Sequence, residues 1–359
     1  MGGKLYLAIT NHGFGHATRA ASVAATVKQL APDIEVIVST TAPRWLLESY
    51  LDAPFGLREV ALDIGVLQKD SLNMDKAATL TALKDIQARQ AELIDRDAQF
   101  LQEAGIGLVL GDIPPLSAVA AKAAQVPCWM MSNFGWDFIY RPWGGEFGAI
   151  ADWIAECFQQ CDRLFRLPFH EDMAAFSTII DVGLTGGTPR YPEDELRSRF
   201  NLTAPKEKTV LLTFGGLGLA QIPYEGLQRF PDWQFITFDR QAPELPNLHK
   251  VSDRQLRPVD FMPLCGRVVS KPGFSTFAEA CRLEIPVVTV TRDNFAEGPV
   301  LVKGLQDHNP HQILQPEQLM TGTWDFLKAD LLPPRTDQRL DKAGNQTIAQ
   351  AIVEYLASL

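Results

Sequence analysis

The chain has 359 residues, of which 46% are hydrophobic and 21% are charged, a balance typical of folded globular proteins. At roughly 100 to 200 residues per domain, this length predicts two domains with a hydrophobic core each, and it excludes a small scaffold stapled by disulfides or a metal. The 43 acidic and 33 basic side chains give a formal charge of −10, which repels phosphate backbones, so we expect no nucleic-acid partner.

The five cysteines are odd in number and lack Cys-x-x-Cys spacing, which indicates neither a disulfide framework nor a zinc site. A reducing compartment suits them, and we expect a cytoplasmic location. The segment Met1-Gly2-Gly3-Lys4 leads into an apolar run that is too short for a secretory signal. No apolar run approaches the roughly 18 residues that a membrane-spanning helix needs, which leaves only peripheral membrane contact open.

In the first half of the chain, short apolar runs alternate with helical patterns, as is typical of a parallel sheet covered by helices. The expected strands are residues 4–9, 34–39, 107–110 and 126–131. The expected helices are residues 16–30, 43–51, 74–104 and 115–124. This half therefore predicts an α/β, Rossmann-like domain over residues 1–182.

A second series of apolar runs predicts a smaller Rossmann-like domain over residues 206–336. Its expected strands are residues 209–214, 234–238, 268–269 and 286–290. Between the two series, residues 183–205 are rich in glycine, proline and charge, which is typical of a linker. Apolar residues recur at helical spacing within residues 337–359, after Pro333-Pro334, and predict a terminal helix.

The first expected strand is followed by Asn11-His12-Gly13-Phe14-Gly15-His16-Ala17-Thr18-Arg19. Glycines let a ligand approach the backbone, and the free amides at a helix start favour an anion. A dinucleotide fingerprint would need glycine at Thr18, so a dinucleotide oxidoreductase is disfavoured. The alternative is a tight turn in which His16 only satisfies the helix start.

Asp112 ends the apolar run Leu108-Val109-Leu110-Gly111, so it lies at the carboxyl end of an expected strand, where open parallel sheets place ligand sites. If this strand neighbours the first, Asp112 can accept the Nδ1 proton of His16 and fix its tautomer, as a carboxylate does in hydrolase triads. The alternative is that Asp112 caps the helix after Pro114-Pro115.

A third segment reads Ser270-Lys271-Pro272-Gly273-Phe274-Ser275-Thr276-Phe277-Ala278-Glu279. A strand here runs into a glycine turn and a helix start, whose amides predict a diphosphate cradle. Glu279 lies one turn after Ser275, where its carboxylate can accept two ribose hydroxyl protons. The alternative is a capping box formed by Ser275 or Thr276 with Glu279.

Two weaker patterns complete the set of candidate segments. Gly215-Gly216-Leu217-Gly218 follows the strand expected at 209–214 and can form a phosphate-side loop, although a lone glycine turn carries little weight. Aromatic residues between 134 and 147, interleaved with polar residues and glycines, suit the binding of a sugar or other acceptor; core packing is the alternative. They are Phe134, Trp136, Phe138, Tyr140, Trp143 and Phe147.

The stretch from Phe261 to Gln306 resembles the donor-binding signature of GT-B glycosyltransferases that use nucleotide sugars, including the peptidoglycan N-acetylglucosaminyltransferase and plant natural-product transferases. The Gly13-Phe14-Gly15-His16 loop is similar to their N-terminal glycine and histidine loop. Together, these segments also resemble the transferase-like N-terminal region of plant L-arabinokinases. The resemblance implies the GT-B fold, with two Rossmann-like domains facing an interdomain cleft and the helix in 337–359 packing back on the first domain.

The resemblance also implies roles for single residues. His16 would be the base that activates the acceptor, and Asp112 its partner. On the donor side, the phosphates, the ribose and the sugar hydroxyls would be bound by Gly215, Gly216, Lys271, Gly273, Phe274, Ser275, Thr276, Glu279, Asp293, Asn294 and Glu297. We place on the acceptor side Gly13, Phe14, Gly15, Arg19, Trp136 and Tyr140. Plant enzymes of this family have histidine at the position of Lys271 and glutamine at that of Asn294.

We therefore expect a glycosyltransferase that moves a sugar from a nucleotide sugar, a UDP-sugar in the first instance, to a hydroxyl acceptor. A base that deprotonates the acceptor for direct displacement predicts inversion. We expect no metal, because no Asp-x-Asp pair accompanies the phosphate loop, and no cofactor besides the nucleotide sugar. The alternatives are a non-hydrolysing sugar-nucleotide epimerase, in which carboxylates would be central, and a non-catalytic sugar-nucleotide sensor, which would need the donor residues alone.

Overall fold

The computed structural model describes residues 3–68, 74–215, 222–292 and 294–359. Their contacts divide them into two compact units. The first unit holds the described residues up to Gln68, together with Met74–Gly186 and Asp341–Leu359, and the second holds those within Gly187–Leu340. Within the described ranges, no helix combines the length and the apolar composition needed to cross a bilayer.

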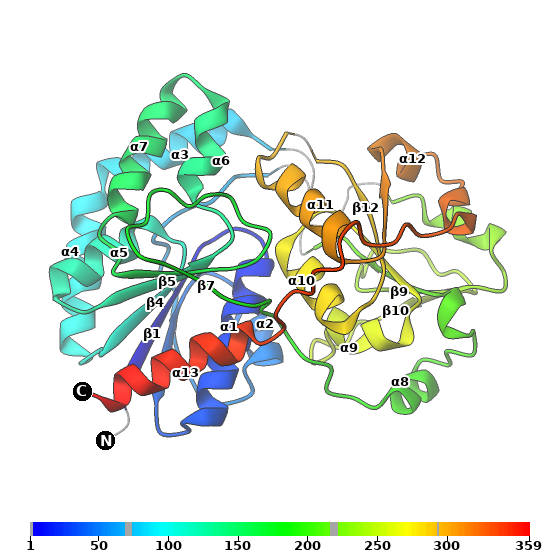
Figure 1. Ribbon diagram of the computed structural model, residues 1–359, viewed down its shortest axis with the longest axis horizontal. Helices are drawn as coiled ribbons and strands as arrows, with labels where there is room; N and C mark the ends of the chain where they lie inside the picture. The colour runs from blue at the N-terminus through cyan, green and yellow to red at the C-terminus, as the bar shows by residue number, and fades with distance from the viewer. Residues whose placement is uncertain (1–2, 69–73, 216–221, 293) are drawn as a thin grey trace. The chain divides into compact units, whose positions relative to one another are not determined.

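The first unit is built on a seven-stranded parallel sheet with the order β3-β2-β1-β4-β5-β6-β7 (Figure 1). Its strands are β1 (Lys4–Ile9), β2 (Glu35–Ser39), β3 (Gly56–Arg58), β4 (Leu108–Asp112), β5 (Cys128–Ser132), β6 (Arg163–Arg166) and β7 (Ile179–Asp181). All residues of β4 and β5 are buried, because helices cover the central strands on both faces. Buried strands of this kind are near-continuous apolar runs in the sequence, which is why the pattern predicted them.

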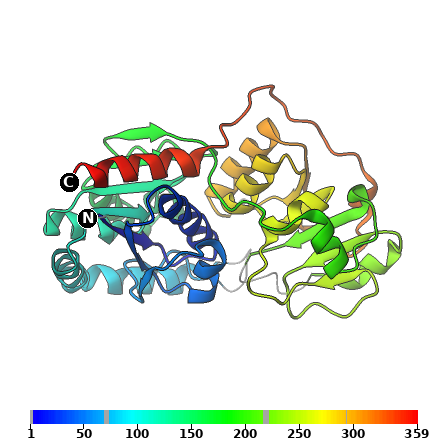
Figure 2. The same cartoon turned by 90° about the horizontal axis from the view of Figure 1, so that it is seen from below.

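The helices of the first unit are α1 (Gly15–Leu30), α2 (Arg44–Tyr50), α3 (Lys76–Ala88), α4 (Gln90–Glu103), α5 (Pro115–Ala124), α6 (Trp136–Tyr140), α7 (Glu146–Phe158) and α13 (Gly344–Ala357). The helix α13 lies alongside α1, as Figures 1 and 2 both show. Its Tyr355 ring packs 5.2 Å from the ring of Trp129 at the start of β5. The end of the chain therefore completes the helical layer over the first sheet.

The single helix expected over residues 74–104 is wrong, because the structure forms two helices that meet at Arg89. The break lets the two halves pack on different neighbours, since α3 contacts α7 whereas α4 contacts α5. The sequence pattern also did not indicate β3, β6 and β7, which have only three or four residues each. Strands this short show too little alternation to be separated from loops.

The second unit has a six-stranded parallel sheet with the order β10-β9-β8-β11-β12-β13. Its strands are β8 (Thr209–Thr213), β9 (Gln234–Thr237), β10 (Leu248–Lys250), β11 (Arg267–Ser270), β12 (Val287–Val290) and β13 (His311–Leu314). Its α-helices are α8 (Glu193–Arg199), α9 (Pro258–Phe261), α10 (Phe274–Leu283), α11 (Glu297–His308) and α12 (Pro316–Met320). Part of the core lies around Phe235 and Trp324, which pack with apolar side chains from the neighbouring strands.

The chain passes from the first unit to the second between Gly186 and Gly187, and it returns between Leu340 and Asp341. These crossings lie four residues beyond the bounds expected at 182 and 336. Residues 183–205, expected as a linker, contain α8, which belongs to the second unit. Leu184 is held within the first unit, where its amide donates to the carbonyl of Asp341 at 2.8 Å. Leu184 and Asp341, which lie next to the crossings at 186/187 and 340/341, are therefore hydrogen-bonded to each other within the first unit.

Candidate active site

The carboxyl edge of the first sheet brings together the two motifs that the sequence separates by almost a hundred residues. Strands β1 and β4 are neighbours, and Ile9 pairs with Asp112 at their carboxyl ends. Beyond β1 the chain turns at Gly13, whose φ of +63° suits glycine, and α1 begins at Gly15. His16, the second residue of α1, is therefore placed beside Asp112.

His16 and Asp112 are in direct contact, with Nδ1 of the ring 2.7 Å from Oδ1 of the carboxylate. Asp112 is fully buried and His16 is 7% exposed. Burial alone would raise the pKa of Asp112, but the charges of Arg19 and His16 outweigh it and hold this pKa below its usual value. Since an ionised carboxylate can only accept, Nδ1 of His16 carries the proton and donates it, which leaves the lone pair of neutral His16 on Nε2.

The alternative in which Asp112 caps the next helix does not describe this structure. Helix α5 has Pro114 at its N-cap, and no side chain caps it. Both oxygens of Asp112 are used by α1 instead, since Arg19 donates from Nε to Oδ2 at 2.7 Å. The expected contact between His16 and Asp112 is therefore present, whereas their catalytic role stays a prediction.

The structure corrects the assignment of Arg19 to the acceptor. Its side chain is 2% exposed, and its guanidinium also donates from Nη2 to Oδ1 of Asp112 at 2.6 Å. Further hydrogen bonds reach Ser132 Oγ at 3.1 Å and Asn133 Oδ1 at 2.9 Å, both at the end of β5. Arg19 is thus enclosed by protein and hydrogen-bonded to Asp112, so its side chain is not exposed to an acceptor.

Trp136 and Tyr140, expected in an acceptor wall, are each 1% exposed, and their rings stack 5.8 Å apart. The indole of Trp136 donates to Thr10 Oγ1 at 3.1 Å, and the hydroxyl of Tyr140 donates to the carbonyl of Gly65. The structure therefore gives these rings the alternative role of core packing, with their polar atoms already satisfied.

The glycine loop itself lies next to His16. Gly13 is exposed, and Phe14 is half-buried, with its ring packed edge to face against Trp45 at 5.8 Å. Gly15 opens α1. Contact of these three residues with an acceptor stays a prediction. Their position directly before His16 is consistent with it.

Two residues of this site received no role from the sequence analysis. Asp63, in the irregular segment between β3 and α3, is 6% exposed and binds the loop that carries His16: it accepts from the amide of Asn11 at 2.9 Å and from the hydroxyl of Thr10. Burial raises the pKa of Asp63 to about 6, although these hydrogen bonds oppose the rise. The only sequence signal was an acid set between apolar residues and followed by glycine, in Leu62-Asp63-Ile64-Gly65.

The second is His12, which belongs to the glycine loop quoted above but received no role there. Its Nδ1 accepts from the amide of Val66 at 3.2 Å, so the neutral ring carries its proton on Nε2. Its ring lies 6.2 Å from the ring of His16 and 5.1 Å from that of Trp136. The segment 63–66 therefore holds the first part of the loop that leads into α1, from Thr10 to His12.

In the second unit, the candidate donor residues gather at the carboxyl ends of β8 and β11, which are neighbours. Gly215 has a φ of +80°, and a Cβ there would lie 3.2 Å from Cε of Lys271. Only glycine therefore lets the loop after β8 approach Lys271 this closely. Burial, together with the charge of Arg292, lowers the pKa of Lys271 to about 8, while Glu297 opposes the fall.

The turn after Lys271 leads directly into α10. Gly273 is the N-cap, with extended backbone, and Phe274, Ser275 and Thr276 form the first turn of the helix. Phe274 is buried, whereas Ser275 and Thr276 are half-buried. The sequence therefore correctly predicted a helix start at this place, and anion binding there stays a prediction.

Glu279 is 4% exposed and accepts from the amide of Gly187 at 2.8 Å through Oε1. Helix α10 has no side-chain cap, so the capping box is not formed. Burial raises the pKa of Glu279 to about 7, opposed by the Gly187 amide and the charges of Arg257 and Arg282. Among the residues that the structure describes, none donates a hydrogen bond to Oε2.

The remaining donor candidates follow β12. Asn294 is exposed, and Glu297, the first residue of α11, is 8% exposed and acts electrostatically on Lys271. Gly216 and Asp293 lie outside the described residues. The expectation that the two domains face an interdomain cleft stays a prediction.

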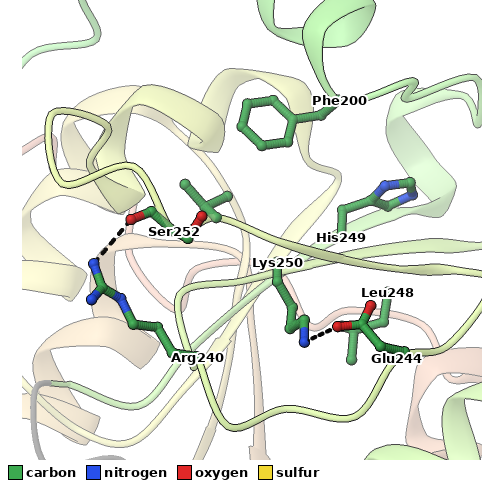
Figure 3. Close-up of a pocket in the computed structure, with 8 residues that line it drawn as sticks. Phe200, Arg240, Glu244, Leu248, His249, Lys250 and Ser252 are labelled. Carbon is green, nitrogen blue, oxygen red and sulfur yellow. Dashed lines mark hydrogen bonds and ion pairs between the residues drawn. The ribbon is translucent and has the colours of Figure 1, made fainter.

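A cavity of about 590 Å³ lies along the edge strand β10 of the second unit (Figure 3). Its basic side chains already have partners: Arg240 donates to the carbonyl of Ser252 at 2.9 Å, and Lys250 pairs with Glu244. Burial lowers the pKa of His249 in its wall, which favours the neutral ring. We therefore assign no charged ligand to this cavity.

No protein-family model matches the chain. The chain is 30% identical to L-arabinokinase of Arabidopsis thaliana over 329 residues, which are 88% of this chain and 31% of that protein. It therefore spans about a third of the length of this curated relative.

Three solved structures show the fold. The calicheamicin glycosyltransferase CalG4 is 13% identical, with a TM-score of 0.59 and 100% of both chains covered. A putative UDP-N-acetylglucosamine 2-epimerase from Listeria monocytogenes is 14% identical, with a TM-score of 0.58 and coverage of 100% and 98%. UGT89C1 of Arabidopsis thaliana, solved with UDP-L-rhamnose, is 12% identical, with a TM-score of 0.59 and coverage of 99% and 94%. With its two parallel sheets and this full-length likeness, the chain belongs to the GT-B fold, built from two Rossmann-like domains.

Proposed function

We propose that the chain is a glycosyltransferase that moves a sugar from a nucleotide sugar to a hydroxyl acceptor with inversion. The observation that carries the proposal is the contact between His16 and Asp112 at the carboxyl edge of the first sheet, which leaves Nε2 of His16 as a proton acceptor. A histidine oriented by a buried carboxylate is the arrangement that general-base catalysis requires.

In this reaction, Nε2 of His16 takes the proton of the acceptor hydroxyl as its oxygen bonds to the anomeric carbon. The bond from that carbon to the diphosphate breaks, and the nucleoside diphosphate leaves with the electron pair. Asp112 stabilises the imidazolium that forms, through the hydrogen bond to Nδ1. Displacement from the face opposite the leaving group inverts the anomeric centre.

The leaving diphosphate would be held by the second unit. The first turn of α10 supplies backbone amides and the positive end of a helix dipole. Lys271, with a pKa of about 8, is mostly protonated at pH 7 and adds a positive charge beside the loop at Gly215. We propose that Asn294, Glu297 and Asp293 bind the hydroxyls of the donor sugar. We also propose that Gly215 and Gly216 bind the diphosphate.

The nature of the donor is supported by the similar proteins. Solved neighbours are described as bound to UDP or to UDP-L-rhamnose, and another neighbour is a calicheamicin glycosyltransferase. We propose a UDP-sugar as donor, no other cofactor, and a hydroxyl-bearing acceptor. A reducing, cytoplasmic setting suits the five buried thiols.

The epimerase alternative is favoured by one observation, the full-length likeness to the putative epimerase of Listeria monocytogenes. Incubation with a panel of nucleotide sugars separates the candidates. A transferase releases nucleoside diphosphate only when an acceptor is present, an epimerase converts the free nucleotide sugar without an acceptor, and a sensor binds it without turnover. NMR analysis of the products distinguishes these three outcomes. The anomeric configuration of a transfer product then tests inversion.

Replacing Glu279 by alanine is expected to weaken nucleoside diphosphate binding by roughly tenfold to a hundredfold, the range for losing charge-assisted hydrogen bonds of about 1.5 to 3 kcal/mol. The reason is that the ribose hydroxyl would lose its proposed hydrogen-bond acceptor, Oε2 of Glu279. Calorimetry measures this affinity, and Glu317→Ala on the exposed face of α12 is the matched control. Equal affinities in both variants would remove Glu279 from the donor site.

Activity is expected to be independent of divalent cations, because the start of α10 and Lys271 can neutralise the leaving diphosphate. The measurement is transfer rate in excess chelator, with added Mg²⁺ or Mn²⁺ in parallel. A rate abolished by the chelator and restored by Mn²⁺ would contradict the expectation. A rate within about twofold in all conditions would support it, since a required metal ion contributes several kcal/mol of charge stabilisation.

A further inference from the structure

Arg19 lies one helical turn after His16 on α1, so both side chains project from the same face toward Asp112. Its guanidinium binds both oxygens of the carboxylate, from Nε to Oδ2 at 2.7 Å and from Nη2 to Oδ1 at 2.6 Å. This is the paired geometry that fixes the plane of a carboxylate as well as its charge. Asp112 is thereby held in one orientation.

The orientation of Asp112 decides which atom faces His16. Oδ1 is shared, because it accepts from Nδ1 of His16 at 2.7 Å and from Nη2 of Arg19 at 2.6 Å. Nη2 of Arg19 also lies 3.0 Å from Nδ1, a contact in which the guanidinium can only donate. The shorter contact, 2.7 Å from Nδ1 to the ionised carboxylate that can only accept, is the one that assigns the proton to Nδ1. The arginine itself is fixed by Ser132 and Asn133 at the end of β5.

We propose that Arg19 is a positioning residue that keeps Asp112 ionised and oriented, so that His16 stays in the tautomer with its proton on Nδ1 and its lone pair on Nε2. This inference deepens the proposed function and rests on it for its catalytic meaning. Arg19 touches neither donor nor acceptor in this role. It acts only through Asp112.

The other groups of the first unit that face this cluster do not replace Arg19. His12 lies edge to face with His16, but its Nδ1 is occupied by the amide of Val66. Asp63 is bound by Thr10 and Asn11, and its negative charge repels the negative charge of Asp112. Phe134 and Trp136 pack against the His16 ring and offer it no charge. Among these described neighbours, Arg19 is the cation that binds the carboxylate of Asp112 directly.

The test reads the tautomer of His16 directly, from ¹⁵N chemical shifts of both ring nitrogens in the full chain at a pH where the ring is neutral. In the unmodified protein, the form with the proton on Nδ1 is expected to dominate. In Arg19→Met, which keeps the length of the side chain and removes its charge, Asp112 is free to rotate or to bind a proton. The form with the proton on Nε2 is then expected to become the major one.

Arg19→Lys gives a graded second measurement, which also decides the matter if Arg19→Met does not fold. A single ammonium group keeps the charge but cannot bind both oxygens with fixed geometry, so an intermediate fraction of the Nε2 form is expected. Asp112→Asn is the reference for loss of the carboxylate. A His16 tautomer unchanged in Arg19→Lys, or in folded Arg19→Met, overturns the proposal.

Kinetics then separate this inference from the proposed function. With a working donor and acceptor, Arg19→Met is expected to lower kcat by about tenfold or more with little change in KM for the donor, because the loss lies in the base. A tautomer change with no sugar transfer by any variant or by the unmodified protein would contradict the proposed function and leave Arg19 as a positioning residue. Sugar transfer by the unmodified protein, with no tautomer change in the Arg19 variants, would support the proposed function and contradict the role of Arg19 as a positioning residue.

Discussion

Replacing His16 by alanine is expected to lower the turnover number for sugar transfer by about 10² to 10⁴, the usual contribution of a positioned general base. The structure supplies the reason, since Nδ1 of His16 is committed to Asp112 and Nε2 is left to take the acceptor proton. Donor affinity should change little, because the residues proposed to bind the donor belong to the second unit. Steady-state kinetics with varied donor, together with calorimetric titration of nucleoside diphosphate, measure the two effects separately.

Asp112→Asn is expected to produce a similar but smaller loss, since the histidine remains but its orientation is no longer fixed. The matched control is His308→Ala, which removes a histidine at the end of α11 in the second unit. Its turnover should stay within about twofold of the unmodified protein, because surface substitutions away from a site are usually close to neutral. Full turnover in His16→Ala would reject the dyad as the base.

Replacing Asp260 by alanine is expected to lower the free energy of unfolding of the second unit by about 3 to 5 kcal/mol, the range for breaking a buried ion pair. Asp260 and Arg257 are 1% and 4% exposed, and Arg257 binds both carboxylate oxygens, from Nη2 at 2.6 Å and from Nε at 3.1 Å. Without the carboxylate, the guanidinium is left as a buried charge. Denaturant titration followed by fluorescence measures the loss.

The same substitution should also loosen the segment after the chain enters the second unit. Asp260 accepts from the amide of Arg190 at 3.0 Å, and Arg257 donates to the carbonyl of Thr188 at 2.6 Å. Faster hydrogen exchange at Arg190 is therefore expected. The control is Asp232→Ala, which breaks the exposed pair with Lys208 at 3.8 Å and should cost about 1 kcal/mol or less. Equal losses of stability in the two variants would contradict the argument.

The sequence by itself determined the fold class and the places where a glycine-containing turn leads from a strand into a helix. Buried parallel strands must be apolar throughout, so the central strands β1, β4, β8 and β12 stood out as runs between helical patterns. Glycines and capping residues are constrained by local backbone geometry, so the loop before α1 and the turn before α10 could also be read directly. Both signals are local, and a single sequence is enough to see them.

Only the tertiary structure decided what each polar side chain near those segments does. Asp63 entered the site from a segment without regular structure, because its role depends on hydrogen bonds to Thr10 and Asn11 more than fifty residues away. Arg19, Trp136 and Tyr140 changed from expected acceptor contacts to buried supports for the same reason. A side chain's partners are set by the pairing of distant strands, here β1 with β4 and β4 with β5, and no periodicity along the chain encodes that pairing.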